Sequence, residues 1–139
     1  MAAYDPENIF AKMIKGEIPC HRLYEDDDTL AFLDIMPRTD GHTLVITKEP
    51  VVDLFGITPE GLGKLMGVVQ RLAPKIKEAV GADGVLIQQF NGAAAGQTVF
   101  HLHVHIVPVK DGAPPKPHAG DMADPDDLTV TARKIRTAL

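Results

Sequence analysis

The residues at 100–108, Phe-His-Leu-His-Val-His-Ile-Val-Pro, constrain the fold more than any other part of this chain. Successive side chains of a β-strand point to opposite faces, so a strand here puts the three histidines on one face and the aliphatic residues on the other. The histidines are His101, His103 and His105. A solvated face is the less favoured interpretation, because the chain has only six histidines and three of them lie in this run. Imidazole is the side chain best suited to nucleophilic attack, proton transfer or metal binding near neutral pH.

Composition excludes several classes of protein. The chain has 139 residues, which suits one domain with a sizeable core. Its net charge of −5 argues against a protein that holds nucleic acid by the phosphate backbone. Cys20 is the only cysteine, so no intrachain disulfide and no thiolate zinc site can form. No signal peptide or membrane span is visible, and we expect a soluble, cytoplasmic protein with no nucleic-acid or membrane partner.

Turn residues and hydrophobic periodicity predict an α+β fold with a five-stranded, mainly antiparallel sheet. A short helix is expected at 8–15, capped by Asn8, and a long helix at 59–80, capped by Thr58. Pro74 lies inside the long helix and predicts a kink or a break there. Strands are expected at 21–25, 29–33, 43–47, 84–90 and in the histidine run.

The C-terminal part of the chain has a different character. Glycines and prolines interrupt residues 111–125, so we divide the chain into a domain at 1–110 and an arm at 111–139. His118, within the arm, is expected to be solvated. Asp124-Pro125 starts a last helix, which either packs back on its own domain or reaches a neighbour. One face of that helix carries Leu128, Ala132, Ile135 and Leu139.

The loop that precedes the histidines has the composition of a phosphate-binding loop. Residues 91–99 read Asn-Gly-Ala-Ala-Ala-Gly-Gln-Thr-Val, and small residues let a ligand approach the backbone N–H groups. Thr98 adds a hydroxyl, and Asn91 and Gln97 add amides. Alternating histidines can bind zinc with a further ligand from elsewhere, or one of them can attack a phosphorus atom. The loop favours the second chemistry, because its amides stabilise charge on phosphate oxygens.

The histidine pattern, preceded by Ala-Gly-Gln-Thr-Val, resembles the signature of the histidine triad superfamily of nucleotide hydrolases and transferases. The resemblance covers roughly residues 5–110, and the single-domain length and intact histidines resemble the histidine-triad nucleotide-binding branch. It implies a homodimer whose two sheets join, with a purine nucleotide as the small-molecule substrate.

The resemblance also assigns unequal roles to the histidines. It implies that His103 is the nucleophile, forming a nucleotidyl-histidine at the α-phosphorus, and that His105 binds the phosphate. His101 would support the ring of His103, and His42 would help to order the triad. Thr98 would contact the phosphate or the leaving group.

The same resemblance implies a nucleotide pocket. Asp34 corresponds to the carboxylate that binds the ribose hydroxyls, and a carboxylate can accept both hydrogen bonds. Contacts with the phosphate and sugar would come from Asn91, Gly96, Gln97, Thr98 and Val99. The purine would lie among Ile9, Phe10, Ile18, Phe32, Leu33 and Ile35.

One departure from the family concerns zinc. Some bacterial members bind a structural zinc through Cys-x-x-Cys, a histidine after the third strand and the first triad histidine. Here those places hold Asn8, Ala11 and Pro50, which leaves only His101. We therefore expect no metal and no other cofactor.

The resemblance implies hydrolysis of purine nucleoside phosphoramidates to AMP or GMP. Two alternatives stay open. One is diadenosine polyphosphate hydrolysis, and the other is a nucleotide-binding scaffold dimer with little catalysis.

Overall fold

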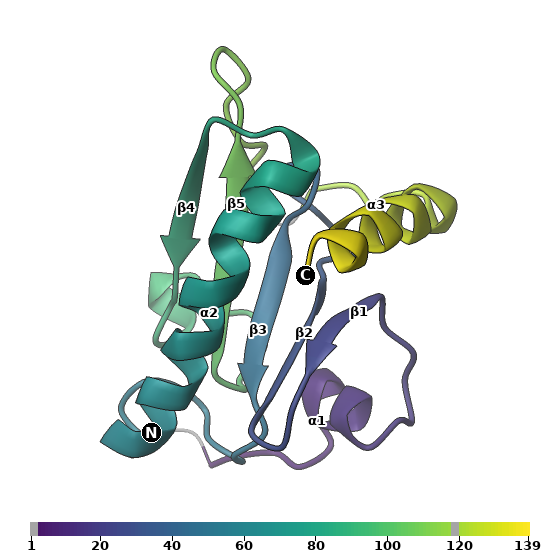
Figure 1. Ribbon diagram of the computed structural model, residues 1–139. Helices are drawn as coiled ribbons and strands as arrows, with labels where there is room; N and C mark the ends of the chain where they lie inside the picture. The colour runs from purple at the N-terminus through teal and green to yellow at the C-terminus, as the bar shows by residue number, and fades with distance from the viewer. Residues whose placement is uncertain (1–2, 118–119) are drawn as a thin grey trace.

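The strands form one open antiparallel sheet. The computed structural model describes residues 3–117 and 120–139, and its strands are β1 (Arg22–Glu25), β2 (Thr29–Leu33), β3 (Thr43–Thr47), β4 (Gly84–Gln88) and β5 (His103–Val109). They pair in the order β1-β2-β3-β5-β4, and each neighbouring pair is antiparallel (Figure 1). The predicted α+β class and its five-stranded antiparallel sheet are confirmed.

The helices begin where the sequence predicts. They are α1 (Ile9–Ile14), α2 (Pro59–Val80) and α3 (Pro125–Ala138). The Asn8 side chain accepts a hydrogen bond from the Ala11 N–H at 2.9 Å, and the Thr58 hydroxyl accepts one from the Gly61 N–H at 3.0 Å. Each bond satisfies an N–H group that the first turn of a helix leaves without an intrahelical partner.

Of the two outcomes predicted at Pro74, a kink or a break, the break does not occur, since α2 runs as one helix from Pro59 to Val80. A proline inside a helix costs about 3 kcal/mol, through a lost hydrogen bond and a steric clash. Ile76 and Val80 follow Pro74 and are both buried in the core. Burial stabilises side chains of this size by about 1.5–3 kcal/mol each, so packing outweighs the cost of the proline.

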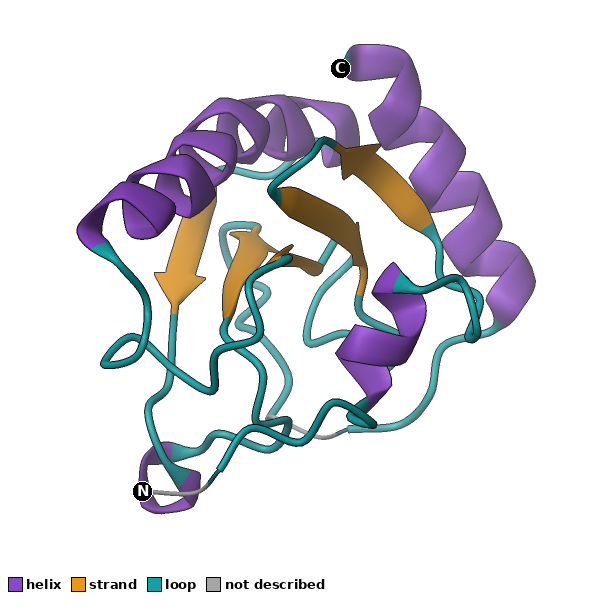
Figure 2. Cartoon of the chain, turned by 90° about the horizontal axis from the view of Figure 1, so that it is seen from below, coloured by secondary structure: helices purple, strands orange, loops and turns teal. Residues whose placement is uncertain are grey.

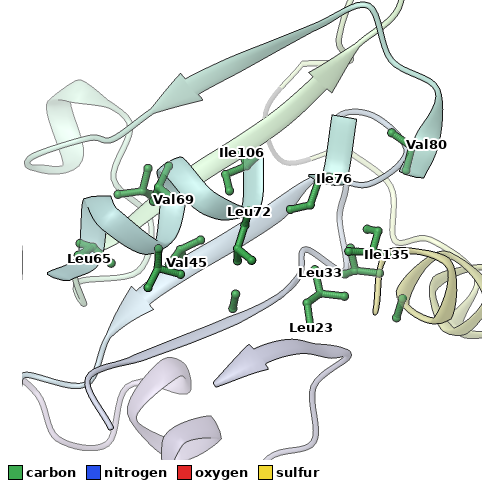
Figure 3. Packing of buried hydrophobic residues seen from close by; sticks show 14 of the residues in the cluster. Leu23, Leu33, Val45, Leu65, Val69, Leu72, Ile76, Val80, Ile106 and Ile135 are labelled. Atoms are coloured by element: carbon green, nitrogen blue, oxygen red, sulfur yellow. The ribbon is translucent and has the colours of Figure 1, made fainter. Parts of the chain in front are cut away.

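Two apolar layers cover the two faces of the sheet. The layer that we call the helix-face core lies between the sheet and the helices α2 and α3, and side chains from all three converge there (Figure 3). The second layer lies under the short helix α1, on the opposite face (Figure 2). Alternation decides which residue belongs to which layer: Leu102, Val104 and Ile106 enter the helix-face core, as predicted.

The C-terminal helix packs back on its own domain. Leu128, Ala132 and Ile135 are buried in the helix-face core. Arg136 donates a hydrogen bond to the Arg22 carbonyl at 2.7 Å, which ties α3 to β1. Leu139, expected on the same apolar face, is 38% exposed because it follows the last turn of the helix.

Three expectations are not decided by this fold. The domain division at residue 110 and the joining of two sheets in a homodimer stay predictions, and position 118 lies outside the described residues. Within the described parts of the chain, no helix is both long and apolar enough to cross a membrane.

The packing of α3 predicts that Ile135→Ala strongly destabilises the whole domain. Ile135 is fully buried, and truncation of such a side chain costs about 2–5 kcal/mol. Val130→Ala on the exposed side of the same helix is the matched control, with an expected change within about 0.5 kcal/mol. Urea unfolding measures both variants, and equal stabilities would contradict this packing.

Candidate active site

Two histidines of β5 face a pocket on the side of the sheet opposite the helix-face core. His103 and His105 line this pocket, whose volume is about 400 Å³. The strand predicted for the whole histidine run begins later than expected: β5 starts at His103, and His101 lies before it. The backbone N–H of Leu102 donates a hydrogen bond to the Val51 carbonyl at 2.9 Å, so the loop after β3 holds the chain just before β5.

The apolar walls of the pocket come from α1, β2 and the segment between them. All six residues expected to surround a purine line it, although the side chain of Leu33 also packs in the helix-face core. The Phe10 ring stands edge-on to His103, with centroids 5.0 Å apart. Sequence reasoning missed further lining residues: Met13, Pro19, Cys20, His21, Met36 and Leu44. Met13 shares the apolar stripe of α1, a signal that could have identified it.

The polar end of the pocket brings together residues from three distant segments. Asp34 follows β2, Thr98 and Val99 end the small-residue loop, and His103 and His105 belong to β5. Thr98 and Val99 of the predicted loop therefore line the same pocket as His103 and His105, whereas His101 does not line it.

Other loop residues predicted to contact the phosphate do not line the pocket. The Gln97 side chain is buried, accepts a hydrogen bond from the Gly92 N–H at 2.8 Å and donates one to the Val52 carbonyl at 2.7 Å. Asn91 accepts a hydrogen bond from the Leu54 N–H at 2.9 Å. Gly96 has a φ of +106°, a conformation that favours glycine. In this structure these residues shape the loop and fasten it to its neighbour.

Hydrogen bonds to the backbone fix the tautomer of His103. Its Nδ1 lies 2.6 Å from the backbone carbonyl of His101. A carbonyl can only accept, so Nδ1 carries the proton, and in the neutral ring the lone pair is on Nε2.

A second chain of hydrogen bonds orders His42 and His105. The Arg38 backbone N–H donates to Nδ1 of His42 at 3.0 Å, so the proton of this neutral ring is on Nε2. That Nε2 lies 3.0 Å from Nδ1 of His105. His105 therefore accepts at Nδ1 and carries its own proton on Nε2. The Asp34 carboxylate lies 3.6 Å from Nε2 of His42.

The same three side chains could be considered as metal ligands. Within residues 3–117 and 120–139, Asp34, His42 and His105 form the one group of three whose ligand atoms all lie within 4.8 Å of one another. A metal on Nε2 of His42 would displace its proton while Nδ1 already accepts from Arg38, which would require an imidazolate. The geometry fits a hydrogen-bonded chain better than a metal site. The absence of a structural zinc stays a prediction.

His101 is anchored at both ring nitrogens. Nε2 lies 2.7 Å from the Thr47 carbonyl, to which it donates, and the Tyr4 hydroxyl lies 2.8 Å from Nδ1. Burial lowers the pKa of His101, and the hydrogen bond to Thr47 opposes this in part. Tyr4 was missed at the sequence level, because no motif or periodicity connects it with the histidines.

These features define a class of small α+β domains in which one strand of an open sheet presents histidines to a pocket closed by a short helix. The HIT domain family matches residues 15–112, and the chain belongs to this family. The resemblance seen in the sequence is thereby confirmed.

Relatives agree with this assignment along the chain. The Bartonella henselae Hit-like protein has a crystal structure that is 47% identical, covers 99% of this chain and 100% of that one, and superposes with a TM-score of 0.92. Adenylylsulfatase HINT3 of Arabidopsis thaliana is 41% identical over 74% of this chain and 52% of its own length. Adenosine 5′-monophosphoramidase hnt1 of Schizosaccharomyces pombe is 40% identical over 72% of each chain.

The buried, neutral His101 predicts a loss of stability in mild acid. Its pKa in the folded protein lies below the usual 6.5, so below about pH 6.5 the unfolded chain binds a proton that the folded chain does not. The free energy of unfolding therefore falls as the pH falls, by at most about 1.4 kcal/mol per pH unit from this one group. Urea unfolding between about pH 7.5 and about pH 5.5 should show a shallower slope for His101→Gln than for the wild type. Identical slopes would contradict this assignment.

Proposed function

We propose that the protein is a hydrolase acting at the α-phosphate of purine nucleotides, and that its reaction passes through a nucleotidyl-histidine at His103. The observation that carries the proposal is the hydrogen bond from Nδ1 of His103 to the His101 carbonyl, at 2.6 Å. It leaves the lone pair on Nε2, and the ring lines a pocket whose volume lies in the usual range for small-molecule sites. An imidazole held in this tautomer is prepared for nucleophilic attack.

The substrate would enter with its purine between the apolar walls of α1 and β2, and with its ribose hydroxyls on the Asp34 carboxylate. Nε2 of His103 attacks the α-phosphorus and forms an N–P bond. The P–N bond to the leaving amine breaks, and the amine departs with the electron pair and takes up a proton from solvent. Water then breaks the bond to His103, which releases the nucleoside monophosphate and restores the neutral imidazole.

Hydrogen-bond donors surround the proposed position of the phosphate. His105 carries its proton on Nε2, because its Nδ1 accepts from His42. The Thr98 hydroxyl and the Val99 backbone lie at the same end of the pocket. Such donors stabilise the negative charge that develops on the oxygens during attack, which is the largest contribution in many phosphoryl and acyl transfers.

The names of two relatives support this class of reaction. Adenylylsulfatase and adenosine 5′-monophosphoramidase both refer to adenylyl compounds. We propose a nucleoside phosphoramidate as the substrate class for this chain, with AMP or GMP as the product.

We also propose that two copies join as a homodimer along β4. This strand forms one edge of the sheet, where β5 is its single partner among the described strands, and its Ile87 is 41% exposed. The opposite edge strand, β1, is tied to α3 through Arg136. An edge strand with an exposed apolar residue is suited to pairing with another chain.

The nucleophile is tested by His103→Ala with adenosine phosphoramidate as the substrate. We expect the release of AMP to fall at least about 1,000-fold, because the variant lacks the imidazole that forms the proposed covalent intermediate. Rapid quenching of the wild type with labelled substrate should trap label on His103. Equally slow release by both proteins would instead favour a nucleotide-binding scaffold.

The ribose contact is tested by Asp34→Asn. Loss of the charge weakens hydrogen bonds from the ribose hydroxyls, so KM should rise about tenfold while kcat changes by less than about threefold. A 2′,3′-dideoxy substrate is the matched control, since it lacks the hydroxyls and its KM should respond little to the substitution. An equal rise in KM for both substrates would place Asp34 in another role.

A further inference from the structure

We propose that Tyr4 is a positioning residue, whose hydroxyl holds His101 and, through the His101 backbone carbonyl, orients the nucleophile His103. This inference rests on the proposed function, because it assigns Tyr4 a part in the reaction at His103. Tyr4 belongs to the segment before α1 and lies 97 residues from His101 in the chain.

The first step of the argument is the bond between the two side chains. The Tyr4 hydroxyl lies 2.8 Å from Nδ1 of His101. Nε2 of that ring donates to the Thr47 carbonyl at 2.7 Å, so Nδ1 of the neutral ring accepts and the phenol is the donor. The ring is fully buried, and an unpaired nitrogen there would be costly. Tyr4 and the end of β3 thus hold His101 from two sides.

The second step is the position of His101 in the backbone. The ladder between β3 and β5 starts at the pair Ile46 and His103, so His101 lies outside it. One backbone bond holds the peptide unit of its carbonyl, from the Leu102 N–H to the Val51 carbonyl at 2.9 Å, and the two side-chain bonds of His101 add to it. The His101 carbonyl accepts a hydrogen bond from Nδ1 of His103 at 2.6 Å. Any motion of the His101 backbone therefore changes the orientation of the nucleophile.

The third step separates the hydroxyl from the pocket wall. Phe10 of α1 contacts both His101 and His103, with ring centroids 6.2 and 5.0 Å apart. Phe10 and Met13 are buried in the second core layer and hold α1 in place independently of Tyr4. Loss of the hydroxyl should therefore affect the chemical step and leave substrate binding nearly unchanged.

The test compares Tyr4→Phe with Tyr24→Phe, which alters the only other tyrosine. The Tyr24 hydroxyl also makes hydrogen bonds, to Asp26 at 2.7 Å and from Arg71 at 3.0 Å, but it does not line the pocket. With adenosine phosphoramidate we expect Tyr4→Phe to lower kcat about tenfold and to change KM by less than about twofold. Tyr24→Phe should leave both values close to the wild type. Unchanged kcat in Tyr4→Phe would overturn the proposal.

A double-mutant cycle tests whether Tyr4 acts through His101. Tyr4→Phe should cost about tenfold in kcat in the wild type and less than about twofold in the His101→Leu background, because leucine offers no acceptor to the Tyr4 hydroxyl. Equal losses in both backgrounds would overturn the proposal.

A measurement without substrate separates this inference from the proposed function. The Nδ1 proton of His103, observed by NMR, should exchange with solvent at least about tenfold faster in Tyr4→Phe than in the wild type or in Tyr24→Phe. Equal exchange rates would overturn the positioning role. A wild-type protein that releases no AMP, yet shows faster exchange in Tyr4→Phe, would refute the proposed function and keep the Tyr4 contact.

Discussion

The antiparallel pairing of β3 with β5 is the constraint on which the rest of the site depends. Leu44 pairs with His105 and Ile46 with His103, so the two strands are in register along the pocket. His42, just before β3, then meets His105, and the Thr47 carbonyl at the end of β3 meets His101. A slip of one residue would turn the imidazoles into the helix-face core and Val104 out of it. The apolar packing that stabilises the fold therefore also sets the position of each imidazole.

Backbone groups, rather than carboxylates, decide where the protons of this site lie. The Arg38 N–H sets the tautomer of His42, the Thr47 carbonyl sets that of His101, and the His101 carbonyl sets that of His103. A backbone carbonyl can only accept and a backbone N–H can only donate, so each partner allows one role for the ring nitrogen that it contacts. The histidines are also close together: the rings of His103 and His105 are 5.1 Å apart. Neutral rings avoid the repulsion that two imidazolium groups would have at this distance.

The alternation of side chains along strands and the capping residues of helices made much of this fold predictable from the sequence. Alternation along the histidine run assigned Leu102, Val104 and Ile106 to one layer and the imidazoles to the other, because a strand permits no other arrangement. Three features were beyond local patterns. Pro74 stays within α2 because Ile76 and Val80 after it are buried in the core, and helix propensity takes no account of such burial. The amide of Gln97 found backbone partners in a loop distant in sequence. Tyr4 lies 97 residues from His101 in the chain, and no local sequence pattern predicts their contact.

The division of the pocket into an apolar slot and a polar end has a consequence for selectivity. Side chains such as Ile9, Ile18 and Phe32 offer dispersion and aromatic contacts, which adenine and guanine satisfy about equally through their faces. A hydrophobic pocket discriminates weakly between ligands of similar shape, whereas hydrogen-bonded groups discriminate strongly. In this pocket Asp34, Thr98 and the β5 histidines lie together, where a ribose and a phosphate would lie under the proposed function, and His21 lines the pocket from the segment between α1 and β2. Under the proposed function, we therefore expect the site to recognise the sugar and the α-phosphate of a nucleotide more strictly than the identity of its base. The atoms that are recognised most strictly would then lie next to the phosphorus that His103 attacks in the proposed reaction.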